Sequence, residues 1–200
     1  IDTTGDGLHK RGYRPAHNAA PLKETMAAAM VKLSRYRGRD DFCDPFCGSG
    51  TIPIEAALIA KNRAPGLYRR FSACNWRWID KNLWEQEREL AVSKEYNGDY
   101  RIVGSDIDPK AIEIANENAR RAGVADIIRF ETADAVKFDR KTSRGVIVTN
   151  PPYGERIMEK QQAEELYRAF GKRYLASENW QLYLLSSHTE FERCFGKTAD

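Results

Sequence analysis

Apolar positions along the chain follow two different periods in turn, and each period predicts one kind of element. Short apolar runs of strand length occupy residues 40–44, 101–107, 126–134, 145–150 and 180–186. Helical spacing predicts helices over residues 19–36, 52–62, 109–121 and 163–175. Strands that alternate with helices form parallel sheets covered by helices on both faces. We therefore predict an α/β fold with a doubly wound, mostly parallel sheet.

The ends of two predicted helices carry recognisable boundary signals. Leu22, Met26, Met30 and Leu33 stand at helical spacing in the first helix, where Pro21 is tolerated in the first turn. In the third helix Pro109 is predicted at the start and Gly123 just past the end, with Asp108 placed to cap the first turn.

Composition narrows the class of protein only a little. The chain has 200 residues, 42% of them hydrophobic and 30% charged, which suits one globular domain. A net charge of +3 permits a nucleic-acid partner without requiring one. The four cysteines form no CxxC pair and the three histidines are scattered, so we expect free thiols and no metal. The sequence shows no membrane span and no signal peptide, which predicts a soluble, cytoplasmic protein.

Polar and glycine residues gather where the predicted strands end. The groups are Asp44 with Gly48-Ser49-Gly50, then Asp106 with Asp108, then Asp134, and finally Asn150 to Tyr153. In a parallel sheet these ends share one rim, where ligands bind. The glycines allow close approach of a ligand, and the helix that begins near Thr51 directs its free amides toward an anion. An acid that ends the second strand is the usual partner of a ribose diol.

The stretch VTNPPYGER follows an apolar strand with two prolines, which cannot donate a main-chain hydrogen bond. Asn150 adds an amide oxygen and Tyr153 adds an aromatic face. Two acceptors and a stacking surface suit a planar base with an exocyclic amine. An ordinary strand-ending turn explains the same letters, because Asn-Pro commonly starts turns.

Two stretches together resemble a known family. DPFCGSGTIPIEAA resembles motif I of S-adenosylmethionine-dependent methyltransferases, and NPPYGER resembles their amino-methylating motif IV. The segment GLHKRGYRPAHNAAPLKETMAAAMV is similar to the one before motif I in the THUMP-linked guanine-N2 methyltransferases of bacterial ribosomal RNA, a group also described as adenine-specific DNA methylases. The resemblance implies a Rossmann-like class I catalytic domain over residues 1–200. Within it, residues 1–37 are an amino-terminal segment and residues 63–100 an insert. An upstream THUMP domain and a closing strand hairpin after Asp200 are expected to lie outside this chain.

The resemblance also implies the site residues. The residues expected to bind S-adenosyl-L-methionine are Asp44, Pro45, Phe46, Cys47, Gly48, Ser49, Gly50, Thr51, Asp106, Ile107, Asp134 and Ala135. Of these, Asp44, Phe46, Gly48, Ser49 and Gly50 would surround its methionine part. Asp106 would bond its ribose hydroxyls, Ile107 would lie against its adenine, and Asp134, with Ala135 beside it, would accept from the adenine amine. The residues expected to act on the amine are Asn150, Pro151, Pro152 and Tyr153. The Asn150 oxygen and the Pro151 carbonyl would accept the two amine hydrogens, while Tyr153 stacks on the base. We expect Cys47 to fill space in the loop without taking part in chemistry.

The implied reaction is methyl transfer to the 2-amino group of a guanine in 23S ribosomal RNA. Motif IV alone also fits an adenine of DNA, a cytosine or a glutamine amide, and a non-catalytic RNA-binding module with the same fold is a third alternative. Around Tyr13, the basic residues Lys10, Arg11 and Arg14 fit either phosphate contacts with base stacking or a solvated turn.

Two further segments are open to more than one interpretation. The insert's three tryptophans, Trp76, Trp78 and Trp84, predict an apolar satellite cluster in preference to an RNA platform. Residues 22–24 either cap the cofactor from the amino-terminal side or simply begin a helix. The oligomeric state cannot be read from the sequence.

Overall fold

The computed structural model of the chain describes residues 2–14, 22–137, 142–153, 157–176 and 179–200. In chain order its elements are α1 (Glu24–Leu33), β1 (Asp41–Asp44), α2 (Thr51–Ala60), the 3-10 turn η1 (Ser72–Asn75), α3 (Lys81–Ser93), β2 (Ile102–Asp106), α4 (Pro109–Ala122), β3 (Ile128–Thr132), the 3-10 turn η2 (Ala135–Lys137), β4 (Gly145–Thr149), α5 (Ile157–Leu175), β5 (Trp180–Leu184) and α6 (Phe191–Phe195).

The five strands form one parallel sheet in the order β3-β2-β1-β4-β5. The chain moves outward from β1 to β3 and then returns to the other side of β1, so the order reverses between β1 and β4. A crevice opens at the carboxyl ends of the strands at such a reversal, and this is where α/β sheets bind ligands. The predicted α/β fold with a parallel sheet is confirmed.

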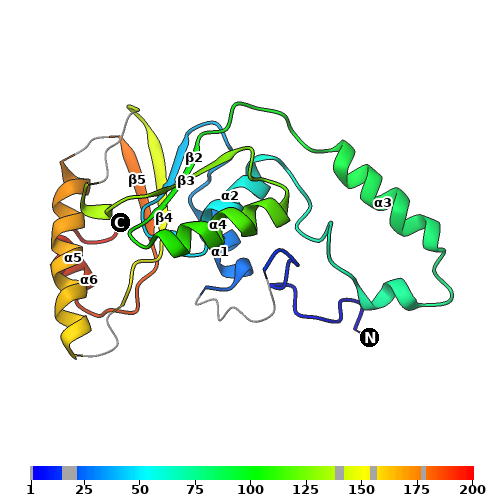
Figure 1. The fold of residues 1–200 in the computed structure, drawn as a ribbon, viewed down its shortest axis with the longest axis horizontal. Coiled ribbons are helices and arrows are strands. Elements are labelled where there is room, and N and C mark those ends of the chain that lie inside the picture. Colours follow the sequence, from blue (N-terminus) through cyan, green and yellow to red (C-terminus); the bar gives the residue numbers. More distant parts are fainter. Residues whose placement is uncertain (1, 15–21, 138–141, 154–156, 177–178) are drawn as a thin grey trace.

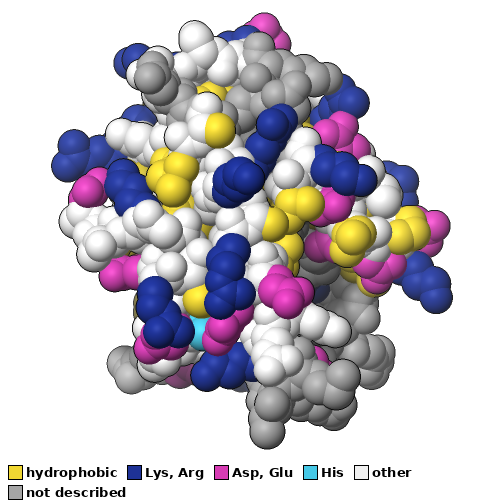
Figure 2. Space-filling view, turned by 90° about the vertical axis from the view of Figure 1, so that its left-hand side faces the viewer, with side chains coloured by type: hydrophobic (Ala, Val, Ile, Leu, Met, Phe, Trp, Pro, Cys, Tyr) yellow, Lys and Arg dark blue, Asp and Glu magenta, His cyan; other side chains and the backbone are white. Residues whose placement is uncertain are grey.

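Helices cover the sheet from both sides, with α1, α2 and α4 on one face and α5 and α6 on the other (Figure 1). Successive strand residues point to opposite faces, so neighbours in β1 enter different cores. Phe42 packs in the large core beneath α1 and α2, whereas Cys43 packs with Ile147 and Trp180 on the α5 side. Figure 2 shows the outer side of the α5 face, where Lys and Arg are mixed with Asp and Glu.

The first helix begins later than its sequence pattern predicts. It starts at Glu24, after Leu22 and Lys23, and residues 19–21 lie outside the described ranges. Of the four apolar residues at helical spacing, Met26 is 48% and Leu33 71% exposed. The buried stripe instead runs through Glu24, Ala27, Met30 and Val31. Small Ala27 permits close packing against α2, and Glu24 turns inward to meet a buried arginine, so tertiary partners outweigh the apolar periodicity.

Other boundaries follow the local signals more closely. Asp108 caps α4 by accepting a hydrogen bond from the Lys110 amide at 2.9 Å, as predicted, and Gly123 ends that helix with φ of 68°. Helix α5 begins at Ile157, six residues before the predicted start, and α6 was not predicted. A helix of only five residues is too short to show a periodic pattern.

The insert over residues 63–100 forms an arm that stands away from the sheet and carries α3 (Figure 1). None of the side chains of α3 is buried. The arm returns to its base through Arg63, whose Nε lies 2.6 Å from Oε1 of Glu95. The tryptophans of the insert form two ring pairs: Trp76 stacks on Trp78 at 5.1 Å, and Trp84 stacks on Phe71. Trp78 remains 78% exposed.

Within the described ranges, none of the helices has the length and apolar character needed to cross a membrane.

Candidate active site

The carboxyl ends of β1, β2 and β4 meet around a cleft of about 750 Å³. It brings together the residues predicted for cofactor binding with those predicted to grip an amine. The predicted residues that line it are Asp44, Pro45, Phe46, Cys47, Gly48, Ser49, Thr51, Asp106, Ile107, Asp134, Ala135, Asn150, Pro151, Pro152 and Tyr153. Gly50 is the one predicted residue that does not line the cleft. The sequence-based grouping of these residues on one rim agrees with this geometry, while their individual roles remain predictions.

A buried carboxyl joins the two halves of the cleft. Asp44, at the end of β1, accepts hydrogen bonds on Oδ1 from the Thr149 hydroxyl at 2.6 Å and from the Phe46 amide at 3.1 Å. Burial raises the pKa of Asp44 to about 7, the two hydrogen bonds oppose that rise, and the charge of Asp106 adds to it. Because Thr149 ends β4, this contact sets Asn150 close to the glycine loop.

The glycine loop is fixed by main-chain bonds to its neighbours. The Cys47 amide donates to the Ser105 carbonyl at 2.9 Å, and the Gly48 amide donates to Oδ2 of Asp106 at 2.9 Å. The other Asp106 oxygen accepts from the Asp108 amide at 3.0 Å. Each carboxylate oxygen has a second lone pair, so the fixed Asp106 carboxylate can still accept hydrogen bonds from ligand hydroxyls.

Gly50 supports the loop from behind. Its φ is 82°, a conformation that favours glycine, and an added Cβ would lie 2.9 Å from both Ala115 Cβ and Phe130. Helix α4 and β3 therefore press against the loop at a point where only glycine fits. This packing explains why Gly50 does not line the cleft.

Hydrogen-bond donors and positive charge gather at the start of α2. The helix has no side-chain cap and no acid in its first turn. Arg14 lines the cleft here with its side chain 9% exposed, donates to the Thr51 hydroxyl and to the Leu22 carbonyl at 3.2 Å, and pairs with Glu24 at 3.7 Å. A helix amino terminus beside a guanidinium group suits a carboxylate ligand. Sequence reasoning missed this position, because nothing in the local pattern around Arg14 indicates which distant helix it meets.

The stacking alternative for Tyr13 is wrong, and the solvated turn holds only for Lys10, which is exposed, because Arg11 and Arg14 are largely buried. Tyr13 is 4% exposed, and its hydroxyl donates to Oε1 of Glu55 at 3.2 Å. Arg11 pairs with the same carboxylate at 3.5 Å. Burial raises the pKa of Glu55 to about 7, while Arg11 acts in the opposite direction. A carboxyl buried in α2 needs these partners, which draws the segment before α1 onto the protein core.

The opposite end of the cleft is less polar. Ile107, which is 73% exposed, lines the cleft there, and so does the buried Ala135 at the start of η2. Asp134 accepts a hydrogen bond from the Val136 amide at 3.1 Å, which orients its carboxylate.

In the glycine loop, burial raises the pKa of the Cys47 thiol, so the thiol stays protonated. This agrees with the expected space-filling place of Cys47.

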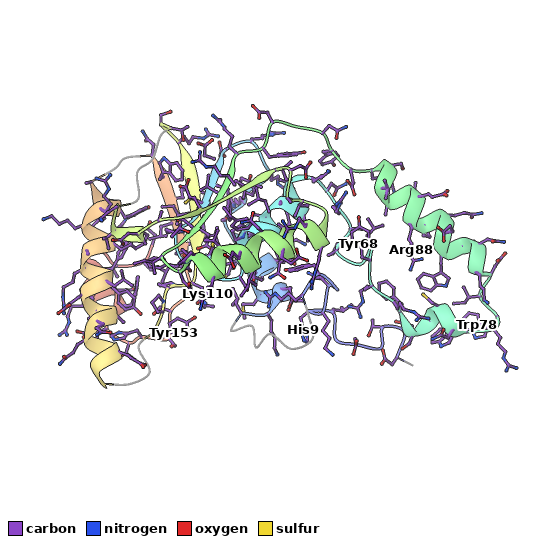
Figure 3. The ribbon with its side chains drawn as sticks, in the orientation of Figure 1. His9, Tyr68, Trp78, Arg88, Lys110 and Tyr153 are labelled. Carbon is purple, nitrogen blue, oxygen red and sulfur yellow. The ribbon has the colours of Figure 1, made fainter. Side chains whose placement is uncertain are left out.

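The turn after β4 presents Asn150, Pro151, Pro152 and Tyr153, whereas residues 154–156 lie outside the described ranges. The Tyr153 hydroxyl donates to Oδ1 of Asn150. An amide oxygen accepts two hydrogen bonds, so one position remains for a further donor. Figure 3 shows Tyr153 on the lower edge of the molecule, the edge on which Lys110 of α4 is also labelled.

Among the described residues, no group of three or more His, Cys, Asp or Glu side chains could hold a metal ion.

The parallel sheet with its reversal at β1, the glycine loop and the Asn-Pro-Pro-Tyr turn in one cleft define a class I methyltransferase domain. The chain belongs to the RMKL-like methyltransferase domain family, UPF0020, which matches residues 11–200. The resemblance seen in the two motifs is thereby confirmed.

Relatives of known sequence or structure agree on the methyltransferase class. A Bacillus subtilis protein named "Putative RNA methyltransferase YpsC" is 46% identical over the whole chain, which covers 52% of that protein. A crystal structure from Listeria monocytogenes, described as a predicted N6-adenine-specific DNA methylase, is 47% identical with a TM-score of 0.96, and the whole chain covers 53% of it. SMU.472, described as a putative methyltransferase complexed with SAH, is 40% identical with a TM-score of 0.93; the whole chain covers 52% of it. The chain thus spans about half the length of these relatives.

Proposed function

We propose that this chain is the catalytic domain of an S-adenosylmethionine-dependent RNA methyltransferase that modifies the 2-amino group of a guanine in 23S ribosomal RNA. The observation that carries the proposal is the single cleft that joins the glycine loop after β1 to the Asn-Pro-Pro-Tyr turn after β4. A relative of 40% identity was crystallised with S-adenosylhomocysteine, the product of that cofactor. A THUMP domain in the rest of the full-length protein would help to capture the RNA.

The cleft residues fit S-adenosylmethionine in size and chemistry. Its volume of about 750 Å³ falls in the range of ligand pockets. The free amides of α2 and Arg14 suit the amino-acid carboxylate, the Asp106 carboxylate suits the ribose hydroxyls, and Ile107 offers an apolar surface to the adenine. Asp134 would accept from the adenine amine. When bound, the cofactor supplies an electrophilic methyl group.

The turn after β4 would act by positioning the amine. The nitrogen of an aromatic amine shares its lone pair with the ring, and acceptors aimed at its two hydrogens help to localise that pair. The Asn150 oxygen and the Pro151 carbonyl are these acceptors, and neither proline has an N–H that would repel the amine. The Tyr153 ring stacks on the base and excludes water. The proton can leave after transfer, so orientation of the amine accounts for most of the rate.

The choice of RNA is supported by the name of the Bacillus relative and by the similarity of residues 7–31 to the guanine-N2 enzymes. The description of the Listeria structure as a predicted N6-adenine-specific DNA methylase favours adenine in DNA as a second candidate substrate. In a folded RNA the base must be unstacked to enter the cleft, at about a few kcal/mol. The insert of residues 63–100 is too short to be a DNA target-recognition domain. A non-catalytic module is disfavoured because both motifs are intact.

Labelled methyl transfer separates these candidates. The full-length protein is incubated with tritiated S-adenosylmethionine and either ribosomal RNA from a strain lacking its gene or unmethylated DNA. We expect label in the 23S RNA, recovered as N2-methylguanosine after digestion. Label in DNA as N6-methyladenine would establish the second candidate, and no label in either would refute methyl transfer to nucleic acid.

Two substitutions test the assigned roles. Asn150→Ala should leave the cofactor Kd within about threefold and reduce transfer by about 100- to 1,000-fold, the usual loss when a transition-state contact is removed. Asp106→Ala should weaken cofactor binding about tenfold or more, measured by calorimetry. Asn116→Ala on α4, which removes an equivalent amide outside the cleft, is the matched control. If Asn150→Ala weakened cofactor binding as much as it reduced methyl transfer, Asn150 would not have the proposed role of holding the amine.

A further inference from the structure

Tyr167 of α5 lies behind the turn after β4 and is hydrogen-bonded to it. The residue is 1% exposed and does not line the cleft, whereas its neighbour Leu166 does. Its hydroxyl donates a hydrogen bond to the Pro152 carbonyl at 2.5 Å. A helix on one face of the sheet is thus linked directly to the main chain of the turn.

The turn has little other support from its own backbone. Pro151 and Pro152 have no N–H, and the last strand contact before them is the bond from the Leu185 amide to the Thr149 carbonyl at 3.1 Å. Among hydrogen bonds that join described residues, none links the main chain of residues 150–153 to another main-chain group. The contact between Tyr153 and Asn150 is internal to the turn and does not anchor it. The bond to Tyr167 holds the turn from outside.

Tyr167 is well suited to be a rigid anchor. Its ring packs edge-on against His188 at 5.6 Å and against Phe191 at 4.7 Å. Burial raises the pKa of Tyr167, so the hydroxyl keeps its proton and remains a donor at neutral pH. The segment after β5 therefore fixes the ring, and the ring in turn places the hydroxyl against the Pro152 carbonyl.

We propose that Tyr167 is a positioning residue for methyl transfer: it holds the Pro152 carbonyl and so sets the path of the turn that grips the base. In a trans peptide the C=O and N–H point in opposite directions, so the bond also turns the Tyr153 amide away from α5. The Pro151 carbonyl and the Tyr153 ring flank this peptide and take their orientation from it. The inference rests on the proposed function, because it concerns the same turn.

The substitution Tyr167→Phe removes one oxygen atom and keeps the ring in place. Tyr174→Phe is the matched control, since the Tyr174 hydroxyl donates to the Trp180 carbonyl at 2.7 Å from the same helix, away from the cleft. In the full-length protein with ribosomal RNA as acceptor, Tyr167→Phe should lower kcat by about 10- to 100-fold, the effect expected when a reacting group is misplaced. The KM for RNA and the cofactor Kd should stay within about twofold, because contacts elsewhere determine them. Equal kcat values for the two variants would overturn the inference.

A second measurement separates this inference from the proposed function. In the cofactor-bound protein, NMR relaxation dispersion of the Tyr153 amide reports whether the turn samples more than one orientation. We expect exchange broadening in Tyr167→Phe and none in wild type or Tyr174→Phe. If wild type transfers no methyl group, the proposed function fails, and the Tyr153 amide alone decides the inference. If the NMR signal of the Tyr153 amide shows no exchange broadening in Tyr167→Phe, the inference is overturned, whether or not wild type transfers a methyl group.

Discussion

Asp44→Asn should stabilise the fold at neutral and alkaline pH. Asp44 is buried at the junction of β1 and β4, and both of its hydrogen bonds are accepted by Oδ1. An asparagine oxygen at the same place can accept both bonds, so the substitution removes a buried charge without removing its donors. The side chains of aspartate and asparagine are nearly the same size, so packing should be unaffected.

The direction of the pH dependence follows from the raised pKa. Burial raises the pKa of Asp44 from its ordinary value of 3.8 to about 7. Well below pH 3.8 the carboxyl is protonated in both folded and unfolded chains, and folding carries no penalty from it. As the pH rises to about 7 the unfolded chain ionises first, so stability is lost across that window and stays low above it.

The pKa difference sets an upper limit on the change in the free energy of unfolding. At about 1.4 kcal/mol for each pKa unit, the interval between 3.8 and about 7 corresponds to about 4 kcal/mol. The new amide NH₂ group brings its own burial cost of about 1–3 kcal/mol where it lacks an acceptor. We therefore expect Asp44→Asn to raise the free energy of unfolding by about 1–3 kcal/mol at pH 8.

Urea unfolding at pH 4 and pH 8, without cofactor, measures this difference for the variant and wild type. The gain should be present at pH 8 and largely absent at pH 4. Asp99→Asn, the same change at an exposed position, should alter stability by less than about 0.5 kcal/mol at both pH values. A variant no more stable than wild type at pH 8, or equally stabilised at both pH values, would refute the argument from burial.

Two further predictions concern the glycine loop after β1 and the base of the arm formed by residues 63–100. Gly50→Ala should cost about 2–5 kcal/mol, because its positive φ and its two close apolar neighbours both oppose a Cβ. Gly48→Ala, with φ of 50° and nothing within 4 Å of the added Cβ, should cost only about 1–2 kcal/mol, so equal losses in urea unfolding would contradict the packing argument. Arg63→Leu should leave Glu95 without its 2.6 Å partner and loosen the base of the arm. Hydrogen exchange at the Tyr96 amide, which donates to the Lys61 carbonyl, should then accelerate about tenfold or more, and an unchanged rate would mean that Arg63 does not anchor the arm.

The sequence alone determined the features that short segments encode. Apolar runs and helical spacing predicted the five strands and helices α1, α2, α4 and α5, whereas α3 in the insert and the short α6 were not predicted. Glycine and proline requirements located the loop around Gly50 and the turn around Pro151, because these residues permit or forbid backbone conformations wherever they stand. The parallel arrangement of the strands then placed both segments at one rim, as the cleft shows.

Only the tertiary structure decided which distant partners each side chain meets. Arg14 reaches the start of α2, Tyr13 is buried against Glu55, and Tyr167 holds the turn after β4. The buried stripe of α1 likewise differs from its apolar spacing, because α2 and an inward-facing carboxylate select another face. Periodicity specifies the form of an element, but its orientation depends on contacts between segments far apart in the chain, which no local pattern records.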